Sequence, residues 1–390
     1  MTTAVAAAFG RIAPLFAAHV VGTASITLVI ALSPSIEDSL GLGHAGFGLM
    51  VSSYYGAMLV LALPAGWLVD RFGLRPMLVL AHALLAIGQL IVASAHDLTM
   101  GVLGLSVCGT GYALINPATA RAVLGWFPRS TRATAMSVKQ TGVPAGGVAA
   151  ALLAATGAAD WRALIAAMAI VTIVAGAGYF ALRVAPAPPI PSTRFGDILA
   201  LLRLPRLAWF NAAACCYAIG QAAFFAWLVL FARDAMAASL ALGSLCLATA
   251  HVASATGRVC WGMLSDRLLR NGRIVCLVAI GLTATIGVVL LLGSPALGAT
   301  MLLAAAGIVG FSLGGYAGLL QAAAVEAVPA DRAGAAIGYN MLSISFGTML
   351  GPGAFGAGVE AIGYLAAWSV TAALALAGAM LFRVSARAGR

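Results

Sequence analysis

The amino-acid sequence predicts an all-α membrane protein with twelve transmembrane helices in two pseudo-symmetric six-helix bundles. Hydrophobic residues make up 62% of the 390 positions and charged residues only 8%, whereas a soluble domain usually carries about a quarter charged residues. Apolar runs of roughly 20 residues, enough to cross about 30 Å of hydrocarbon, recur along the whole chain. A loop motif that occurs once in each half is the third observation behind this fold class.

Charges, prolines and polar clusters separate the apolar runs into twelve expected spans. Their boundaries are 12–33, 45–67, 76–95, 98–121, 133–156, 162–182, 208–232, 239–263, 274–292, 298–324, 333–357 and 364–383. No small-residue cleavage site follows the short opening segment, so we expect an uncleaved first helix. Lipid is therefore the expected solvent of most of the chain.

Basic residues are distributed unevenly between the two sets of loops. The tails and the loops after the even-numbered spans hold 17 of the 21 basic residues, while the opposite loops hold only Arg162 and Arg233. Short cytoplasmic loops accumulate Lys and Arg, so we expect both termini in the cytoplasm and a multi-pass protein of a bacterial inner (plasma) membrane. The net charge of +10 then signals topology and attraction to anionic lipids, and not nucleic-acid binding.

The longest polar interval, residues 183–206, divides the chain into two sets of six spans. Four prolines near its start are followed by a short basic amphipathic stretch, which is typical of a linker on the membrane surface. We expect an N-terminal six-helix bundle over 1–182, a cytoplasmic linker with an amphipathic helix over 183–206, and a C-terminal six-helix bundle over 207–390. The linker can be a plain spacer or a regulatory segment, and the sequence fits both interpretations.

The loop motif between the second and third spans has a second copy between the eighth and ninth. The first copy reads Gly66-Trp67-Leu68-Val69-Asp70-Arg71-Phe72-Gly73-Leu74-Arg75, and the second reads Gly262-Met263-Leu264-Ser265-Asp266-Arg267, with Gly272-Arg273 beyond. The copies lie 196 residues apart, at the same place in each half. This spacing indicates an internal duplication of a six-helix unit.

The pattern G-x-L-x-D-R-x-G-x-R resembles the most characteristic motif of the major facilitator superfamily, and the loop length and number of spans fit the resemblance over the whole chain. The resemblance implies a carrier that works by alternating access, with this loop bracing one half against the other. The gating residues expected on that basis are Asp70, Arg71, Arg75, Gly66, Gly73, Asp266 and Arg267. The alternative is a basic turn that only sets topology.

Two cations lie inside predicted spans: Lys139, which is the only lysine, and Arg258. A charge near the bilayer centre costs about 2.5–3.5 kcal/mol, so it needs a partner or a role. All eleven acidic residues map to loops or helix ends, so no carboxylate is expected beside these cations. A cavity with such charges should attract anions, which predicts a small carboxylate or oxyanion as solute. The alternative is that both side chains snorkel to the interface.

Arg258 resembles the eighth-helix Arg of monocarboxylate and oxalate/formate transporters, which pairs with the substrate carboxylate in those carriers. The oxalate type also has a basic residue in the eleventh helix, where this chain has Tyr339 and Asn340. That departure argues against a dicarboxylate, although Lys139 could supply a second cation from the other half. His251, seven residues before Arg258 and on the same helix face, is our first choice for a proton-linked site because imidazole titrates near neutral pH. His19 is another imidazole inside a span, and exchange of anions needs no titrating group.

The solute-binding residues that we expect are Arg258, Lys139, Gln140, Asn116, Tyr339, Asn340, His251, Tyr217 and Gln221. Any of them can instead bond a neighbouring helix. The sequence has no nucleotide-binding loop and no metal-ligand spacing, so we expect no cofactor, no metal and no direct use of ATP. The prediction is a monomeric secondary transporter whose partners are a small-molecule solute, membrane lipids and, where coupling requires them, protons.

Two other functions compete with this prediction. A proton-coupled drug or neutral-metabolite exporter of the same fold usually carries an Arg where this chain has Leu105, and its fifth helix usually reads G-P-x-x-G-G where this chain has only Pro144-Ala145-Gly146-Gly147. A membrane-embedded enzyme or sensor needs a nucleophile and base, a metal cluster or a soluble domain, and the sequence shows none. We therefore expect no enzymatic activity.

Overall fold

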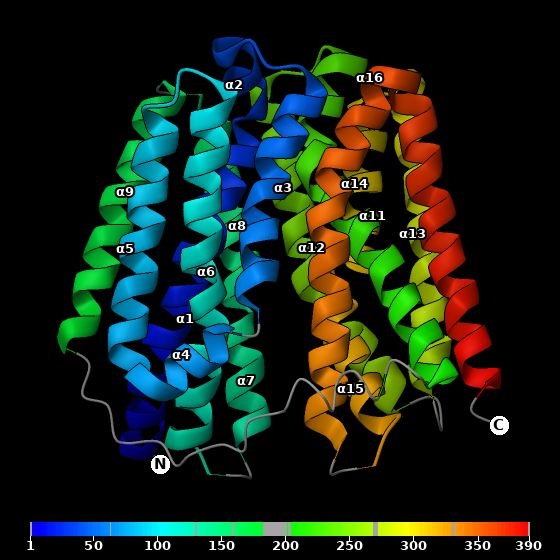
Figure 1. Ribbon diagram of the computed structural model, residues 1–390. Helices are drawn as coiled ribbons and strands as arrows, with labels where there is room; N and C mark the ends of the chain where they lie inside the picture. Colours follow the sequence, from blue (N-terminus) through cyan, green and yellow to red (C-terminus); the bar gives the residue numbers. More distant parts are fainter. Residues whose placement is uncertain are drawn as a thin grey trace. The chain divides into compact units, whose positions relative to one another are not determined.

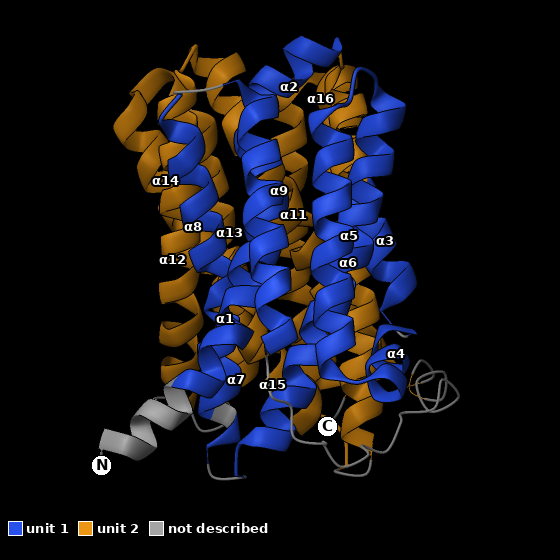
Figure 2. Cartoon of the chain, turned by 90° about the vertical axis from the view of Figure 1, so that its left-hand side faces the viewer, with its two compact units in different colours: residues 1–41, 53–191 blue, residues 42–52, 192–390 orange. Residues whose placement is uncertain are grey.

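The computed structural model of the chain describes residues 2–62, 64–128, 131–157, 160–181, 201, 204–267, 272–329 and 332–388. Within these ranges every regular element is helical, which confirms the predicted all-α class. The chain divides into two compact units, residues 1–41 with 53–191 and residues 42–52 with 192–390 (Figure 2). Each unit is built from helices that pack on one another.

Unit 1 contains the helices of the first half of the sequence. They are α1 (Thr2–Ala31), α2 (Ser33–Leu40), α4 (Pro64–Phe72), α5 (Leu74–Ala93), α6 (Leu98–Trp126), α7 (Arg132–Gln140), α8 (Gly142–Ala155), α9 (Trp161–Gly178) and the short 3₁₀ helix η1 (Tyr179–Ala181) (Figure 1). α3 (His44–Leu61) starts in unit 2 and continues in unit 1 from Ser53. α1 packs against α6, α7 and α8, and α5 packs against both α6 and α9.

Unit 2 contains the remaining helices. They are α11 (Pro205–Met236), α12 (Leu240–Arg267), α13 (Gly272–Leu297), α14 (Ala299–Leu313), α15 (Ala317–Glu326) and α16 (Ala333–Arg387). α11 packs along α16, α12 packs against α14, and α13 packs against both α14 and α16. α16 holds Gly363 at φ 78° and ψ 168°, outside the helical region, so two helices meet there across a kink.

Nine of the described helices are long and apolar enough to cross a membrane, and ten if α3 and α4, bent by 60° at their junction, form one span. Two features explain why this number of helices is lower than the predicted twelve. The predicted span 133–156 is divided into α7 and α8, of 9 and 14 residues, and the last two predicted spans run together as α16. A multi-pass membrane fold is therefore established, while the number twelve stays a prediction.

The predicted limits of the two bundles and the linker also stay predictions. Residues 182–200 and 202–203 lie outside the described residues, and they include most of the expected linker with its amphipathic helix. Leu201 is described: it is buried in unit 2 against Leu207, Ala335 and Ala336.

Glycines bring helix backbones into direct contact within each unit. A Cβ atom on Gly109 of α6 would lie 2.1 Å from the carbonyl oxygen of Tyr54, and one on Gly257 of α12 would lie 2.1 Å from that of Phe311. No side chain fits at such distances. Small residues at these crossings therefore set how closely the helices approach.

Replacing Gly257 by Ala should destabilise the protein by about 1–3 kcal/mol, because the added methyl group forces α12 away from α14. Gly262, on the same helix, is the matched control: a Cβ there meets nothing within 4 Å, and Ala gains about 0.8–1 kcal/mol of helix propensity over Gly. Thermal unfolding midpoints in detergent measure both changes. Equal midpoints for Gly257→Ala and the unaltered protein would contradict this packing.

Candidate functional site

Lys139 lies in the last turn of α7, and its side chain is only 1% exposed. Its Nζ donates to Oδ1 of Asn116 and to Oγ1 of Thr119, both on α6 and both at 3.0 Å. Nε2 of His19 on α1 lies 3.5 Å from the same nitrogen. In the described part of unit 1 the amine is thus surrounded by amide, hydroxyl and imidazole groups, and none of its partners is a carboxylate.

Local sequence explains why α1 reaches this site. Gly142, the first residue of α8, faces α1 so closely that a Cβ atom on it would lie 2.6 Å from the carbonyl oxygen of Phe16 and 2.9 Å from Cβ of His19. The absence of a side chain at position 142 lets the imidazole approach α6, where Nε2 of His19 lies 3.0 Å from Oγ1 of Thr119. Thr119 also donates to the carbonyl oxygen of Ile115 at 2.8 Å, which fixes its hydroxyl.

Asn116 and Gln140 form the more exposed edge of this cluster. Both are half-buried, and Nε2 of Gln140 donates to Oδ1 of Asn116 at 3.4 Å. Oδ1 of Asn116 therefore accepts hydrogen bonds from Gln140 on one side and from Lys139 on the other. The structure brings these three predicted residues together. Thr119 was missing from the predicted set, because a threonine in an apolar helix gives no sequence signal.

A second polar cluster lies in unit 2 around Tyr316, which follows α14. The Tyr316 hydroxyl donates to Oε1 of Gln221 at 3.4 Å. Arg258 on α12 is half-buried and acts electrostatically on both His251 and Tyr316. The His251 ring packs against Phe225 of α11, with 4.6 Å between ring centroids. Of the predicted residues, Gln221 therefore bonds Tyr316 directly, and Arg258 links Tyr316 and His251 electrostatically.

The other three predicted solute residues make packing contacts. Tyr217 is fully buried and donates to the carbonyl oxygen of Leu277 at 2.6 Å, which ties α11 to α13. Asn340 is fully buried and donates from Nδ2 to Oδ1 of Asn211 at 3.0 Å. Tyr339 is half-buried against the small apolar cluster that contains Leu207.

In the first copy of the loop motif, Asp70 forms an ion pair with Arg121 near the end of α6. The flanking arginines bond elsewhere. The Arg71 guanidinium lies 5.8 Å from the ring centroid of Trp67 and 5.7 Å from that of Phe72, while Arg75 donates to the carbonyl oxygen of Phe180 at 3.5 Å. Gly73 has φ 86° and separates α4 from α5, and a Cβ on Gly66 would meet nothing within 4 Å.

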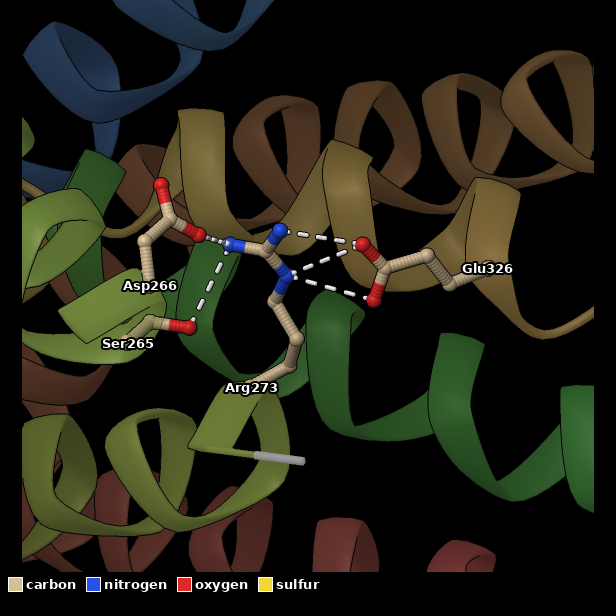
Figure 3. A network of polar contacts seen from close by, with 4 residues as sticks. All are labelled: Ser265, Asp266, Arg273 and Glu326. Carbon is tan, nitrogen blue, oxygen red and sulfur yellow. Dashed lines mark hydrogen bonds and ion pairs between the residues drawn. The ribbon is translucent and has the colours of Figure 1, made fainter. Parts of the chain in front are cut away.

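In the second copy, Arg273 bridges two carboxylates (Figure 3). It donates from Nη1 to Oδ1 of Asp266 at 2.6 Å and from Nη2 to Oε1 of Glu326 at 2.9 Å. Ser265 accepts a further hydrogen bond from Nη1 at 3.3 Å. Arg267, the last residue of α12, is exposed. The two equivalent aspartates therefore have different partners.

The motif alone did not indicate Arg121 or Glu326 as partners of the loop. Each is a charged residue close to the end of the fourth predicted helix of its half, and that shared position is the signal by which sequence reasoning could have found them. No group of three or more His, Cys, Asp or Glu side chains in the described residues is arranged to hold a metal ion.

Each unit consists of apolar helices with a few buried polar groups. This architecture is typical of a multi-pass membrane transport protein. The family model of the Major Facilitator Superfamily matches residues 15–300, and the chain belongs to this superfamily. Its members move small molecules across membranes and are not enzymes. The predicted family and the absence of enzymatic activity are thereby confirmed.

Three relatives and one solved structure illustrate the similarity. An uncharacterised MFS-type transporter of Mycobacterium tuberculosis (strain CDC 1551 / Oshkosh) is 26% identical over 361 residues, 91% of this chain and 80% of that protein. A probable galactarate/D-glucarate transporter of Bacillus subtilis (strain 168) is 30% identical over 115 residues, 26% of this chain and 24% of that protein. A putative multidrug resistance protein of Salmonella paratyphi B is 31% identical over 111 residues, 28% of this chain and 24% of that protein. A bacterial homologue of the human lysosomal transporter Spinster, in an inward-facing and occupied conformation, has a TM-score of 0.80 at 15% identity, covers 96% of both chains, and shows the fold alone.

Removing the charge of Asp70 and removing the charge of Arg121 should destabilise the protein by different amounts. Arg121 is 12% exposed and Asp70 is 42% exposed, so Asp70→Asn strands a shielded guanidinium and should cost about 1–3 kcal/mol. Arg121→Gln leaves a carboxylate that water can reach and should cost less than about 1 kcal/mol. Unfolding midpoints of both single variants and the double variant give the coupling, and a larger loss from Arg121→Gln would refute this account.

Proposed function

We propose that the chain is a secondary active transporter that moves a small anionic solute across the inner membrane by alternating access. The observation that supports an anion is the setting of Lys139, a buried amine whose partners are neutral groups. A cation inside the membrane costs up to about 2.5–3.5 kcal/mol, the value at the centre of a spanning helix. A carboxylate or oxyanion that took the place of Asn116 beside Nζ would offset that cost by direct charge pairing.

Arg258 supplies the second cation, in unit 2. A guanidinium can hold a carboxylate through two parallel hydrogen bonds. Arg258 acts electrostatically on His251 and Tyr316, and Tyr316 in turn bonds Gln221. We infer that each unit contributes solute-binding residues: Lys139 with Asn116 and Gln140 in unit 1, and Arg258 with Gln221 and His251 in unit 2. Tyr217, Tyr339 and Asn340 remain candidates, and their present contacts favour a role in helix packing.

The names of two relatives support different solutes. Galactarate and D-glucarate, in the name of the Bacillus subtilis relative, are sugar dicarboxylates and fit a cationic site. The multidrug resistance name of the Salmonella relative favours the second candidate function, a proton-coupled drug or neutral-metabolite exporter. Both matches cover only about a quarter of this chain. The resemblance of Arg258 to the corresponding arginine of monocarboxylate and oxalate/formate carriers also supports an anionic solute.

The two loop motifs support a gating role within each unit. Asp70 ties α4 to α6 through Arg121, and Asp266 ties α12 to α13 and α15 through Arg273. These ion pairs hold each loop in a defined position. We infer that loops braced in this way control access to the solute, with Gly66 and Gly73 shaping the turn and Arg71, Arg75 and Arg267 lying beside it.

We further infer twelve spans, a monomer, and both termini in the cytoplasm. Counting α3 with α4 as one span, α7 with α8 as another, and α16 as two helices joined at Gly363 raises the number from nine to twelve. The distribution of basic residues supports the orientation. The bundle limits 1–182 and 207–390, with a cytoplasmic linker over 183–206, follow from the same reading.

Arg258→Gln should reduce uptake of labelled lactate or D-glucarate into proteoliposomes at least tenfold, because the site loses its charge pairing with the carboxylate. Arg258→Lys should restore part of the activity, since it keeps the charge without the planar geometry. Uptake rates are measured with and without a pH gradient and with internal counter-solute.

Arg383→Gln is the control for that experiment, because it removes the same charge from an exposed position near the end of α16. Its uptake should match that of the unaltered protein. Unchanged carboxylate uptake by Arg258→Gln argues against the anion site, and transport of a cationic drug but no carboxylate by the unaltered protein favours the exporter.

The orientation predicts the behaviour of reporter fusions. A fluorescent protein that folds only in the cytoplasm should be bright at the C-terminus, and alkaline phosphatase, which needs the opposite compartment, should be inactive there. Alkaline phosphatase inserted after Gly157, in the loop between α8 and α9, should be active because that loop follows an odd-numbered span. The reverse pattern would place both termini outside.

A further inference from the structure

Three tyrosines gather in unit 1 close to the Lys139 site. Tyr54 and Tyr55 lie on α3, with their rings edge to face and 5.2 Å between the ring centroids, and the ring of Tyr112 on α6 lies 6.1 Å from that of Tyr54. Tyr112 also acts electrostatically on the other two tyrosines. Its hydroxyl lies 3.1 Å from Oγ1 of Thr23 on α1. Together Tyr54, Tyr55 and Tyr112 form a tyrosine cluster where α1, α3 and α6 meet.

The tyrosine cluster and Lys139 contact neighbouring residues of the same helix, α6. Nζ of Lys139 donates to Oδ1 of Asn116 at 3.0 Å. Asn116 follows Tyr112 by four residues, so their side chains are neighbours on the helix surface, about 6 Å apart along the helix axis. A solute whose carboxylate pairs with Nζ therefore meets the tyrosine rings if the rest of the molecule extends about one helical turn.

The side of α6 that carries Tyr112 lies opposite an exposed apolar position of the same helix. Leu103 is 54% exposed, and Tyr112 follows it by nine residues, about two and a half turns. Tyr112 and Asn116 are nevertheless half-buried, as is Tyr55 on α3. Because polar groups inside spans face the protein interior or water and avoid lipid, this side of α6 is the one that a polar solute can reach.

The tyrosine cluster also contains a buried hydroxyl that no described residue satisfies. Tyr54 is 1% exposed, and among the described residues its hydroxyl has no hydrogen-bond partner. A tyrosine hydroxyl can both donate and accept, and a buried one that stays unpaired destabilises the protein. By contrast, Tyr179, another buried tyrosine of unit 1, donates to the carbonyl oxygen of Pro14 at 2.9 Å. Aromatic packing explains the ring contacts of Tyr54, but it does not explain the unpaired hydroxyl.

We propose that the tyrosine cluster is an aromatic subsite next to Lys139, and that the solute is a carboxylate with a hydroxylated aromatic ring. The proposal rests on the proposed function, which places the carboxylate at Lys139. The solute ring inserts between Tyr55 and Tyr112, because aromatic rings favour edge-to-face and offset contacts with one another, and its hydroxyl pairs with that of Tyr54. Aromatic walls with a few placed polar groups are typical of small-molecule sites. Short aliphatic carboxylates reach only the amine.

Isothermal titration calorimetry of the purified protein with three monocarboxylates of similar size tests the solute class. The affinity should fall at least fivefold from 4-hydroxybenzoate to benzoate, which lacks the hydroxyl, and at least fivefold again to cyclohexanecarboxylate, which lacks the aromatic ring. Equal affinities for all three would overturn the aromatic subsite and leave the anionic solute in place. If the protein binds none of the three, and neither lactate nor D-glucarate, the anion function and the aromatic subsite fail together.

Tyr54→Phe tests the hydroxyl, because it removes only that group. It should lower the affinity for 4-hydroxybenzoate to that for benzoate, since the solute hydroxyl loses its partner. Tyr179→Phe is the matched control: it removes the hydroxyl of another buried tyrosine of unit 1 and should keep the order of the three affinities. A Tyr54→Phe variant that still prefers 4-hydroxybenzoate by the full factor overturns the proposal.

Tyr55→Leu tests the ring, because it keeps apolar surface and removes the aromatic face. It should lower the affinity for benzoate to that for cyclohexanecarboxylate, since benzoate loses its ring contact. Undiminished preference for benzoate in this variant contradicts the placement of the solute ring. If either variant fails to fold, the three affinities of the unaltered protein still decide the solute class.

Discussion

Hydrocarbon cannot hydrogen-bond a polar group, and the structure of this chain depends on that constraint. Every buried donor or acceptor has to find a partner within the protein, or its burial costs several kcal/mol. The backbone meets the requirement by forming helices throughout the described residues. Lys139 meets it by donating to Asn116 and Thr119 of α6, with the His19 ring of α1 beside the amine.

Close backbone packing makes this arrangement possible. A fully buried amine needs neighbouring helices near enough for side chains as short as Thr and Asn to reach it. Glycine at position 142 allows this at the site itself, and Gly109 and Gly257 do the same at other helix crossings. Contacts this close leave little room for the helices of one unit to shift against one another.

Comparison of the loop motifs shows how a duplicated element diverges. Asp70 and Asp266 occupy equivalent places, yet the first pairs with an arginine at the end of α6 and the second with Arg273, which also holds Glu326. The charge at the end of the fourth helix has changed sign between the halves. In the second loop Arg273, the counterpart of Arg75, pairs with both acidic groups, so both loops remain tied to their helices.

Properties that follow from composition and order along the chain could be predicted from the sequence: the all-helical class, the multi-pass membrane fold, the superfamily and the presence of a lysine without a nearby carboxylate. They depend on the length of apolar runs and on where charges interrupt them, which are one-dimensional quantities.

The partners of individual side chains could not be predicted, because they depend on how each helix is rotated and how closely it approaches its neighbours. His19 contacts Lys139 from 120 residues away and Arg121 contacts Asp70 from 51, while Tyr217, expected at the solute site, bonds the backbone of α13. Small differences in packing between helices of similar composition decide these contacts, and only the tertiary structure contains them.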